Sequence, residues 1–109
     1  MPLVKGTLDV LVLKTLSWHP MHAFEIAKWL EARSDGRLSV EDAALMQALH
    51  RMEERQLLEA EWGQTENGRR ARYYRLTVAG RAHLRAETKR LSEYVDALTS
   101  VLTSRTANT

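Results

Sequence analysis

The sequence contains no cysteine among its 109 residues. This absence excludes a disulfide framework, a thiolate metal site and a cysteine nucleophile. Long apolar runs are missing as well, because no stretch approaches the roughly 20 residues that a membrane-spanning helix needs. The first six residues lack the basic region, apolar core and cleavage site of a secretory signal. We therefore expect a cytoplasmic protein with no membrane partner.

The patterns that catalysis and cofactor binding require are also missing. The four histidines show no metal-ligand spacing. Only five glycines occur, and Gly63 and Gly68 bracket a predicted turn instead of forming a phosphate-binding loop. No serine, histidine and acid stand out as a catalytic triad. We therefore expect no enzyme activity, no metal and no cofactor.

Charge is nearly balanced, with 16 Lys and Arg against 14 Asp and Glu, so the total charge predicts no partner. The position of the charges is more informative. Arg69, Arg70, Arg72 and Arg75 lie close together in a segment without an acid. Arginines neutralise phosphates, release counterions and fit a narrow minor groove. This basic cluster therefore predicts contact with a nucleic acid, and a solvated hairpin without a partner is the alternative.

Helical spacing of apolar residues predicts three helices in the first half of the chain. The first begins after Thr7, the second covers about Met21 to Ala32, and the third covers roughly Glu41 to Gln56. Ser39 with Asp42 resembles a capping box before the third helix. Leu45, Leu49 and Met52 form the core stripe of that helix, which leaves Gln47, Arg51 and their neighbours on its outer face.

Two strands and a long helix complete the predicted elements. Alternating residues predict strands at 57–62 and 71–76, joined by a turn at Asn67-Gly68. In the second strand, one of the two tyrosines should face the core and the other should face outward. Thr77 is the expected cap of a last helix that ends near Thr103.

The last helix carries a heptad pattern. Apolar residues recur every seven positions, with a second set four positions later. Such a long stripe cannot fold back on so small a domain, so it predicts a two-fold homodimer, with intramolecular packing as the alternative. The expected dimerisation residues are Leu84, Leu91, Val95, Leu98 and Leu102.

The order of these elements predicts a mainly α fold with a small β-hairpin, a winged helix-turn-helix followed by a long dimerisation helix. In this architecture the third helix enters the DNA major groove, and the hairpin, or wing, lies on the backbone or in the minor groove. We expect a winged-helix DNA-binding domain at 1–77, a dimerisation helix at 78–103 and a flexible tail at 104–109.

Five segments, taken in order, resemble the PadR family of winged-helix regulators. They are residues 6–13 (GTLDVLVL), 20–27 (PMHAFEIA), 48–54 (ALHRMEE), 60–63 (AEWG) and 69–80 (RRARYYRLTVAG). The resemblance implies a bacterial or archaeal transcriptional repressor that dimerises through its C-terminal helix, in the compact subclass with a single such helix. It also implies that a small aromatic or drug-like effector can bind near the dimer interface and relieve repression, as in some members.

The start of the third helix departs from the PadR pattern. The family usually has Gly-Ser/Thr-Leu-Tyr-Pro where this chain has Ala43-Ala44-Leu45-Met46-Gln47, and it favours Gly at Ala23 and Gln56. The phosphate contacts of the missing hydroxyl groups are lost, whereas Gln47 can pair bidentately with adenine. A degenerate protein-interaction module that binds DNA only non-specifically is therefore the alternative to a sequence-specific repressor.

Two sets of binding residues follow from these arguments. The expected partner is double-stranded DNA with a (pseudo)palindromic operator, because a two-fold dimer presents two recognition helices. The expected DNA-binding residues are Ala44, Gln47, His50, Arg51, Arg69, Arg70, Arg72 and Tyr74. Trp18 and Trp29 are the candidates for an effector site, although core packing is the more frequent role of tryptophan, and Trp62 should pack under the hairpin.

Overall fold

The structure, a computed structural model, describes residue 3 and residues 6–105 of the chain. The elements are α1 (Leu8–Leu16), α2 (Ala23–Arg33), α3 (Asp42–Glu54), β1 (Leu58–Gln64), β2 (Arg70–Leu76) and α4 (Val78–Leu102). The mainly α fold with one hairpin is confirmed. Of the expected tail at 104–109, residues 106–109 lie outside the described residues.

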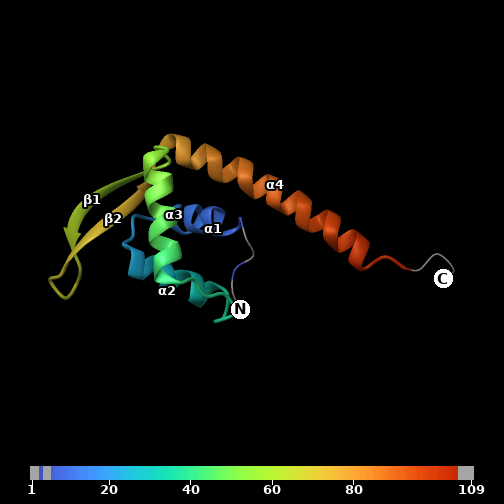
Figure 1. Cartoon of the computed structure of the whole chain (residues 1–109), viewed down its shortest axis with the longest axis horizontal. Coiled ribbons are helices and arrows are strands. Elements are labelled where there is room, and N and C mark those ends of the chain that lie inside the picture. Colours follow the sequence, from blue (N-terminus) through green and yellow to red (C-terminus); the bar gives the residue numbers. More distant parts are fainter. Residues whose placement is uncertain (1–2, 4–5, 106–109) are drawn as a thin grey trace.

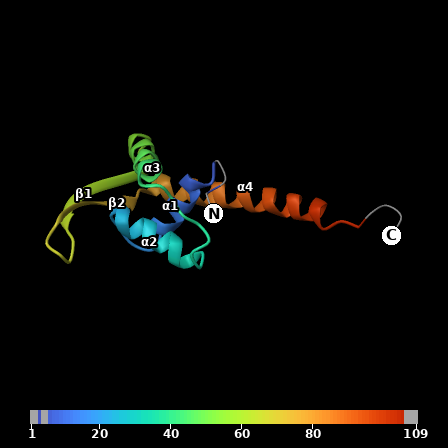
Figure 2. The ribbon, with the colours of Figure 1, turned by 60° about the horizontal axis from the view of Figure 1, so that its bottom comes forward.

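The molecule is elongated because two elements project from a central group of helices. Helices α1, α2 and α3 form this group, and the hairpin and the far end of α4 extend from it to opposite sides (Figures 1 and 2). The principal extents are 64 × 29 × 21 Å. No helix in the described part of the chain is long and apolar enough to cross a membrane.

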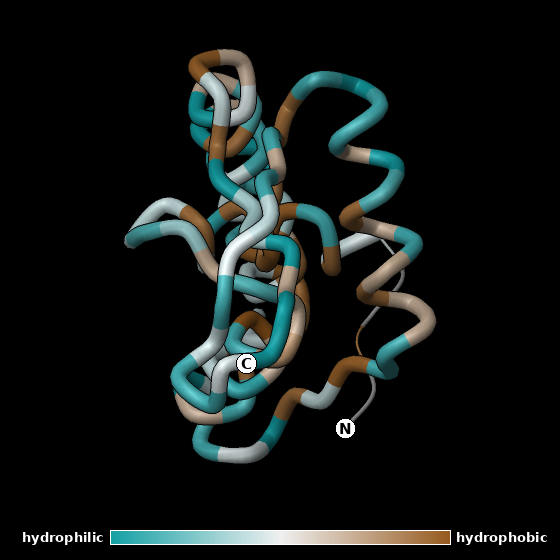
Figure 3. The backbone as a smooth tube through the Cα atoms, turned by 90° about the vertical axis from the view of Figure 1, so that its left-hand side faces the viewer, coloured by the Kyte–Doolittle hydropathy of each residue, from teal (hydrophilic) through white to brown (hydrophobic). Residues whose placement is uncertain are grey.

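The core lies between the three helices and the base of the hairpin. Hydrophobic residues recur among hydrophilic ones along the helical segments, as expected of helices that bury one face (Figure 3). Leu45, Leu49 and Met52 of α3 are fully buried, which confirms the predicted stripe, and they meet Leu13 of α1 and Ile26 of α2 in one cluster. Each such side chain contributes roughly 1.5–3 kcal/mol by leaving water.

The starts of α2 and α3 differ from the sequence prediction. A capping box begins α2: the backbone N–H of Glu25 donates to Nδ1 of His22 (3.3 Å), and the backbone N–H of His22 donates to the Glu25 carboxylate (3.2 Å). The predicted cap of α3 is wrong, because Glu41 occupies the N-cap position without a side-chain cap bond and Asp42 is already the first helical residue. Ser39 therefore lies too far upstream to cap the helix.

The two strands pair antiparallel, from Leu58 opposite Leu76 to Gln64 opposite Arg70. The Gly68 N–H donates to the carbonyl of Thr65 (2.9 Å), and the Thr65 N–H donates to the carbonyl of Arg69 (2.8 Å). Gly68 has φ 76°, in the left-handed region that glycine adopts without steric cost. The turn therefore lies where Asn67-Gly68 predicted it, as a three-residue loop closed by glycine.

Helix α4 begins at the base of the hairpin. The Gly80 N–H donates to Thr77 Oγ1 (2.9 Å), which confirms the predicted cap, and the Thr77 hydroxyl donates to the carbonyl of Gln56 (2.7 Å). The first half of α4 packs on α1, with Leu84 against the core. Every described residue after Leu91 is exposed.

Candidate nucleic-acid interface

The outer face of α3 presents the residues expected to read DNA. Ala44 is half-buried, whereas Gln47, His50 and Arg51 are exposed. The spacing of three or four residues places Ala44, Gln47 and Arg51 on one side of the helix. Arg51 Nη2 lies 2.8 Å from Asp9 Oδ1 on α1, in an exposed ion pair that fixes little of its orientation.

The basic cluster, formed by Arg69 and three arginines of β2, divides into arginines with and without a carboxylate partner. Arg69 and Arg70 are exposed and, among the described residues, form no ion pair with a carboxylate. Arg75 pairs with Glu59 directly across the hairpin, at 2.8 Å. The sequence predicted DNA contacts for Arg69, Arg70 and Arg72, and the structure leaves Arg69 and Arg70 without a carboxylate partner among the described residues.

Arg72 has a partner on α3. Its Nη1 and Nη2 donate to the two carboxylate oxygens of Glu53, at 3.0 and 2.8 Å. The hydrogen bonds that Arg72 donates to the Glu53 carboxylate are the main cause that raises the pKa of Arg72 above its ordinary value. A bidentate pair of this kind adds geometric specificity as well as energy. The pair joins the wing to the last turn of α3.

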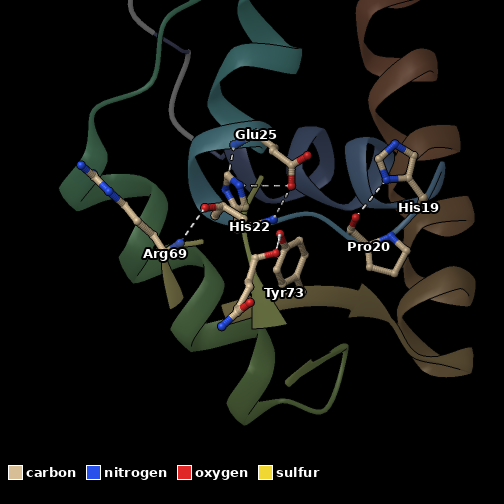
Figure 4. A network of polar contacts seen from close by, with 8 residues as sticks. His19, Pro20, His22, Glu25, Arg69 and Tyr73 are labelled. Carbon is tan, nitrogen blue, oxygen red and sulfur yellow. Dashed lines mark hydrogen bonds and ion pairs between the residues drawn. The ribbon is translucent and has the colours of Figure 1, made fainter. Parts of the chain in front are cut away.

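The expected role of Tyr74 as a DNA contact is wrong. Tyr74 is only 2% exposed and belongs to the core cluster. It stands opposite Ala60, and that face of the hairpin also carries Leu58 and Leu76. Alternation along the strand turns Tyr73 to the other face, where its hydroxyl donates to the carbonyl of Gln64 (3.1 Å) and its ring lies 5.3 Å from that of His22 (Figure 4).

The expectation that Trp62 packs under the hairpin is also wrong. Trp62 is 57% exposed, because it lies on the core-facing side of the hairpin but beyond the end of the core. The guanidinium of Arg70 lies 4.3 Å from the centroid of its ring, and that of Arg72 lies 6.0 Å away. Trp62 and Arg70 thus form a cation–π pair on the wing surface.

An open groove of about 960 Å³ separates the wing from the starts of α2 and α3. Phe24, 68% exposed, lies in its wall on α2, with Lys28 Nζ 5.4 Å from the centroid of the ring. Met46 of α3 also lines it, together with Trp62, Arg69 and Arg70. Phe24 and Lys28 were not among the predicted site residues, although their spacing of four on a helix brings their side chains together.

The two tryptophans expected at an effector site do lie together. The rings of Trp18 and Trp29 are 6.5 Å apart, and the Arg33 guanidinium lies 5.6 and 5.0 Å from their centroids. Lys14 adds a second cation 5.9 Å from Trp18. Trp18 is exposed and Trp29 is half-buried, so the pair forms a surface cluster at the ends of α1 and α2.

The predicted dimerisation seam divides into two parts. Leu84 packs against the core of its own chain and Leu91 is half-buried. Val95, Leu98 and Leu102 are exposed, and Tyr94 and Val101 beside them are exposed as well. Within residue 3 and residues 6–105, no group of three His, Asp or Glu side chains is placed to hold a metal ion.

Comparison with known proteins gives a consistent result. Residues 12–86 match the model of the transcriptional regulator PadR-like family, a range that spans α2, α3 and the whole hairpin. An uncharacterized protein X of Lysinibacillus sphaericus is 26% identical over 91 residues, which cover 84% of each chain.

Solved structures of regulators also resemble this chain. A PadR family transcriptional regulator from Eggerthella lenta DSM 2243 is 28% identical, with 93% of this chain and 86% of that chain covered and a TM-score of 0.77. A PadR family transcription regulator from Clostridium difficile R20291 is 25% identical, with 89% and 99% covered and a TM-score of 0.75.

Proposed function

The chain belongs to the PadR-like family of transcriptional regulators, and we propose that it is a repressor that binds a (pseudo)palindromic DNA operator as a homodimer. The observation that carries this proposal is the Arg72–Glu53 pair, which joins the basic hairpin to the last turn of α3. A helix and a wing in this relation fit the major groove and the adjacent backbone or minor groove. Binding to chromosomal DNA would place the protein in the cytoplasm.

The residues of α3 would supply sequence discrimination. Gln47 can donate to and accept from an adenine, Arg51 can reach guanine or phosphate, and the methyl group of Ala44 can contact a thymine methyl. His50 would donate to a phosphate. Arg69 and Arg70 would contact phosphates and thereby set the register of the wing.

Arg72 would act as a positioning residue. Both of its terminal nitrogens are engaged by Glu53, so a phosphate contact would require breaking a bidentate ion pair. An intact pair would fix the angle between the wing and α3. This angle decides whether α3 and the wing can reach two neighbouring DNA grooves at the same time. The role of Arg72 is therefore geometric, and Arg69 and Arg70 carry the charge.

The exposed half of α4 would form the dimer. Val95, Leu98 and Leu102 lie on one stripe with heptad spacing, and an antiparallel or crossed copy of the same stripe would cover them. Dimerisation would present two α3 helices to two half-sites. A repressor of this design gains affinity from both half-sites at once.

The tryptophan cluster supports a further regulatory step. Arg33 already lies against both indole rings, so a flat aromatic effector of the same size would find stacking partners there. We assign the effector site of the proposed repressor to Trp18 and Trp29. Quenching of their fluorescence by an aromatic ligand that also releases DNA is the measurement that checks this site.

Footprinting on the DNA upstream of the protein's own gene tests the main proposal. The protein should protect two half-sites about one helical turn apart at physiological salt, with a scrambled duplex as the control. Gln47→Ala should weaken operator binding by about 1–3 kcal/mol and relax the base preference at one position per half-site. Binding that disappears at physiological salt, without preference for the operator over the scrambled duplex, would instead indicate the non-specific interaction module.

A further inference from the structure

The groove between the wing and α2 carries two matching cation–aromatic pairs on opposite walls. On the wing, Arg70 lies 4.3 Å from the ring of Trp62, and on α2, Lys28 lies 5.4 Å from the ring of Phe24. Both rings are more than half exposed, and Met46 adds an exposed apolar side chain from α3 to the same groove. Large apolar side chains gathered in this way mark an interaction site.

We infer that this groove clasps the sugar–phosphate backbone of one DNA strand between Arg70 and Lys28, and this inference rests on the proposed function. The two cations would contact phosphates, and the apolar side chains would pack against the deoxyribose rings between them. Each ring limits the rotamers of the cation beside it, so less conformational entropy is lost when the phosphate binds. The aromatic residues thus act as positioning residues for the charges.

The charge of the groove fits a polyanion. Two carboxylates line it, those of Glu25 and Glu66. The Glu25 carboxylate accepts from the backbone N–H of His22 and lies 3.4 Å from His22 Nε2, so it is held at the N-terminus of α2. Among the described residues, the lining cations without a carboxylate partner are Lys28, Arg69 and Arg70, and they outnumber the remaining acid.

The location of the groove also fits this occupant. Met46 lies on the side of α3 that lines the groove with the wing, next to the face assigned to the major groove, and Arg69 and Arg70 lie at the tip of the wing. A strand that passes from the major groove at α3 to the wing would cross the space between them. A small aromatic ligand would use the rings but would gain little from cations on two separate walls.

Single substitutions in the full chain test the clasp by the salt dependence of binding to a duplex of upstream DNA. Lys28→Ala and Arg70→Ala should each weaken binding about 3- to 30-fold and lower the slope of log K against log salt by about 2, one phosphate per subunit of the dimer. Lys89→Ala, an exposed cation on α4, is the matched control and should change neither value. Phe24→Ala and Trp62→Ala should weaken binding about 2- to 10-fold with little change in slope, and Trp62→Phe should restore it.

The emission of Trp62 gives an independent readout. In a Trp18→Phe, Trp29→Phe double variant, Trp62 is the remaining tryptophan, and duplex binding should quench it. Two results would overturn the clasp without contradicting the proposed repressor function. One is unchanged Trp62 emission when the duplex binds. The other is a Lys28→Ala variant that binds like the unmodified chain while Arg70→Ala does not. Failure of the unmodified chain to bind any upstream duplex at low salt would overturn both proposals.

Discussion

The hairpin and the second half of α4 both project from the helical group, but they differ in their exposed side chains (Figure 1). The wing presents Arg69 and Arg70, and the far end of α4 presents Val95, Leu98 and Leu102. Cations on a projecting hairpin favour a polyanion, whereas an apolar stripe favours a second apolar surface. The two projections therefore indicate two different partners for one small chain.

The two projections also differ in how the chain supports them. Arg72 of the wing donates hydrogen bonds to Glu53 of α3, and Met21 forms a backbone bridge to Tyr74 on the free edge of β2. The second half of α4 lacks such support, since every described residue after Leu91 is exposed. An isolated helical segment of this length is marginal in water. The wing is therefore fixed to the helical group by contacts within the chain, whereas the described residues at the end of α4 have no such contacts.

Leu98→Asp should have the largest effect, and it should act on α4 alone. Each buried leucine contributes roughly 1.5–3 kcal/mol, and a two-fold interface contains it twice, so the dimer Kd should rise about 100-fold or more. Leu98 is 44% exposed in the single chain, so the helical group and the hairpin should keep their fold, and any loss of helix should be confined to the end of α4. Sedimentation or light scattering over a concentration series measures the loss, and circular dichroism measures the fold.

Ser100→Asp is the matched control for this variant, because it adds the same charge to the other side of α4. It should leave the dimer unchanged. If Leu98→Asp remains dimeric at the same concentrations, the apolar stripe is not the interface. The end of α4 would then not be the surface that binds a second copy of the chain.

Gly80→Ala should have the next largest effect, because it acts where both projections begin. A Cβ on Gly80 would lie 2.1 Å from the carbonyl oxygen of Leu57, which precedes the wing. The backbone must shift, at a cost of about 1–3 kcal/mol, part of which the better helix propensity of alanine offsets. Thermal unfolding should show a Tm lower by roughly 5–15 °C. Val78→Ala, at an exposed position in the same turn, should leave Tm nearly unchanged.

The positions of both projections could be predicted from the sequence because their signals are local. The Asn67-Gly68 turn fixes the loop of the wing, and the Thr77 cap with the heptad leucines fixes α4. Strand register is not local. Which tyrosine faces the core depends on how β1 pairs with β2, and a shift of one residue reverses every side chain. Tyr74 was therefore assigned to the wrong face.

Long-range contacts account for most of the candidate site that could not be predicted. Arg72 and Glu53 are 19 residues apart, and their pairing depends on the angle between the wing and α3. The groove depends in the same way on the distance between α2 and the wing. Trp62 has an apolar side chain on the core-facing side of its strand, and only the limited extent of the core leaves it exposed.

Gln56→Gly should have the smallest of these effects and the opposite sign. Gln56 has φ 63°, a left-handed conformation that costs an L-residue roughly 1–2 kcal/mol and that the PadR pattern fills with glycine. The backbone carbonyl that accepts the Thr77 hydroxyl remains in the variant. After the greater entropy of glycine in the unfolded chain is subtracted, a gain of about 0.5–1 kcal/mol should remain.

Arg55→Gly is the control for this prediction, because Arg55 has an ordinary φ of −80° and should lose stability with glycine. Denaturant unfolding should therefore move the two neighbouring variants in opposite directions. DNA affinity and the dimer Kd should not change in Gln56→Gly. Position 56 lies where the wing and α4 begin, and it belongs neither to the basic cluster of the wing nor to the apolar stripe of α4. Equal losses in both variants would show that the strain at Gln56 is relieved by contacts that glycine cannot make.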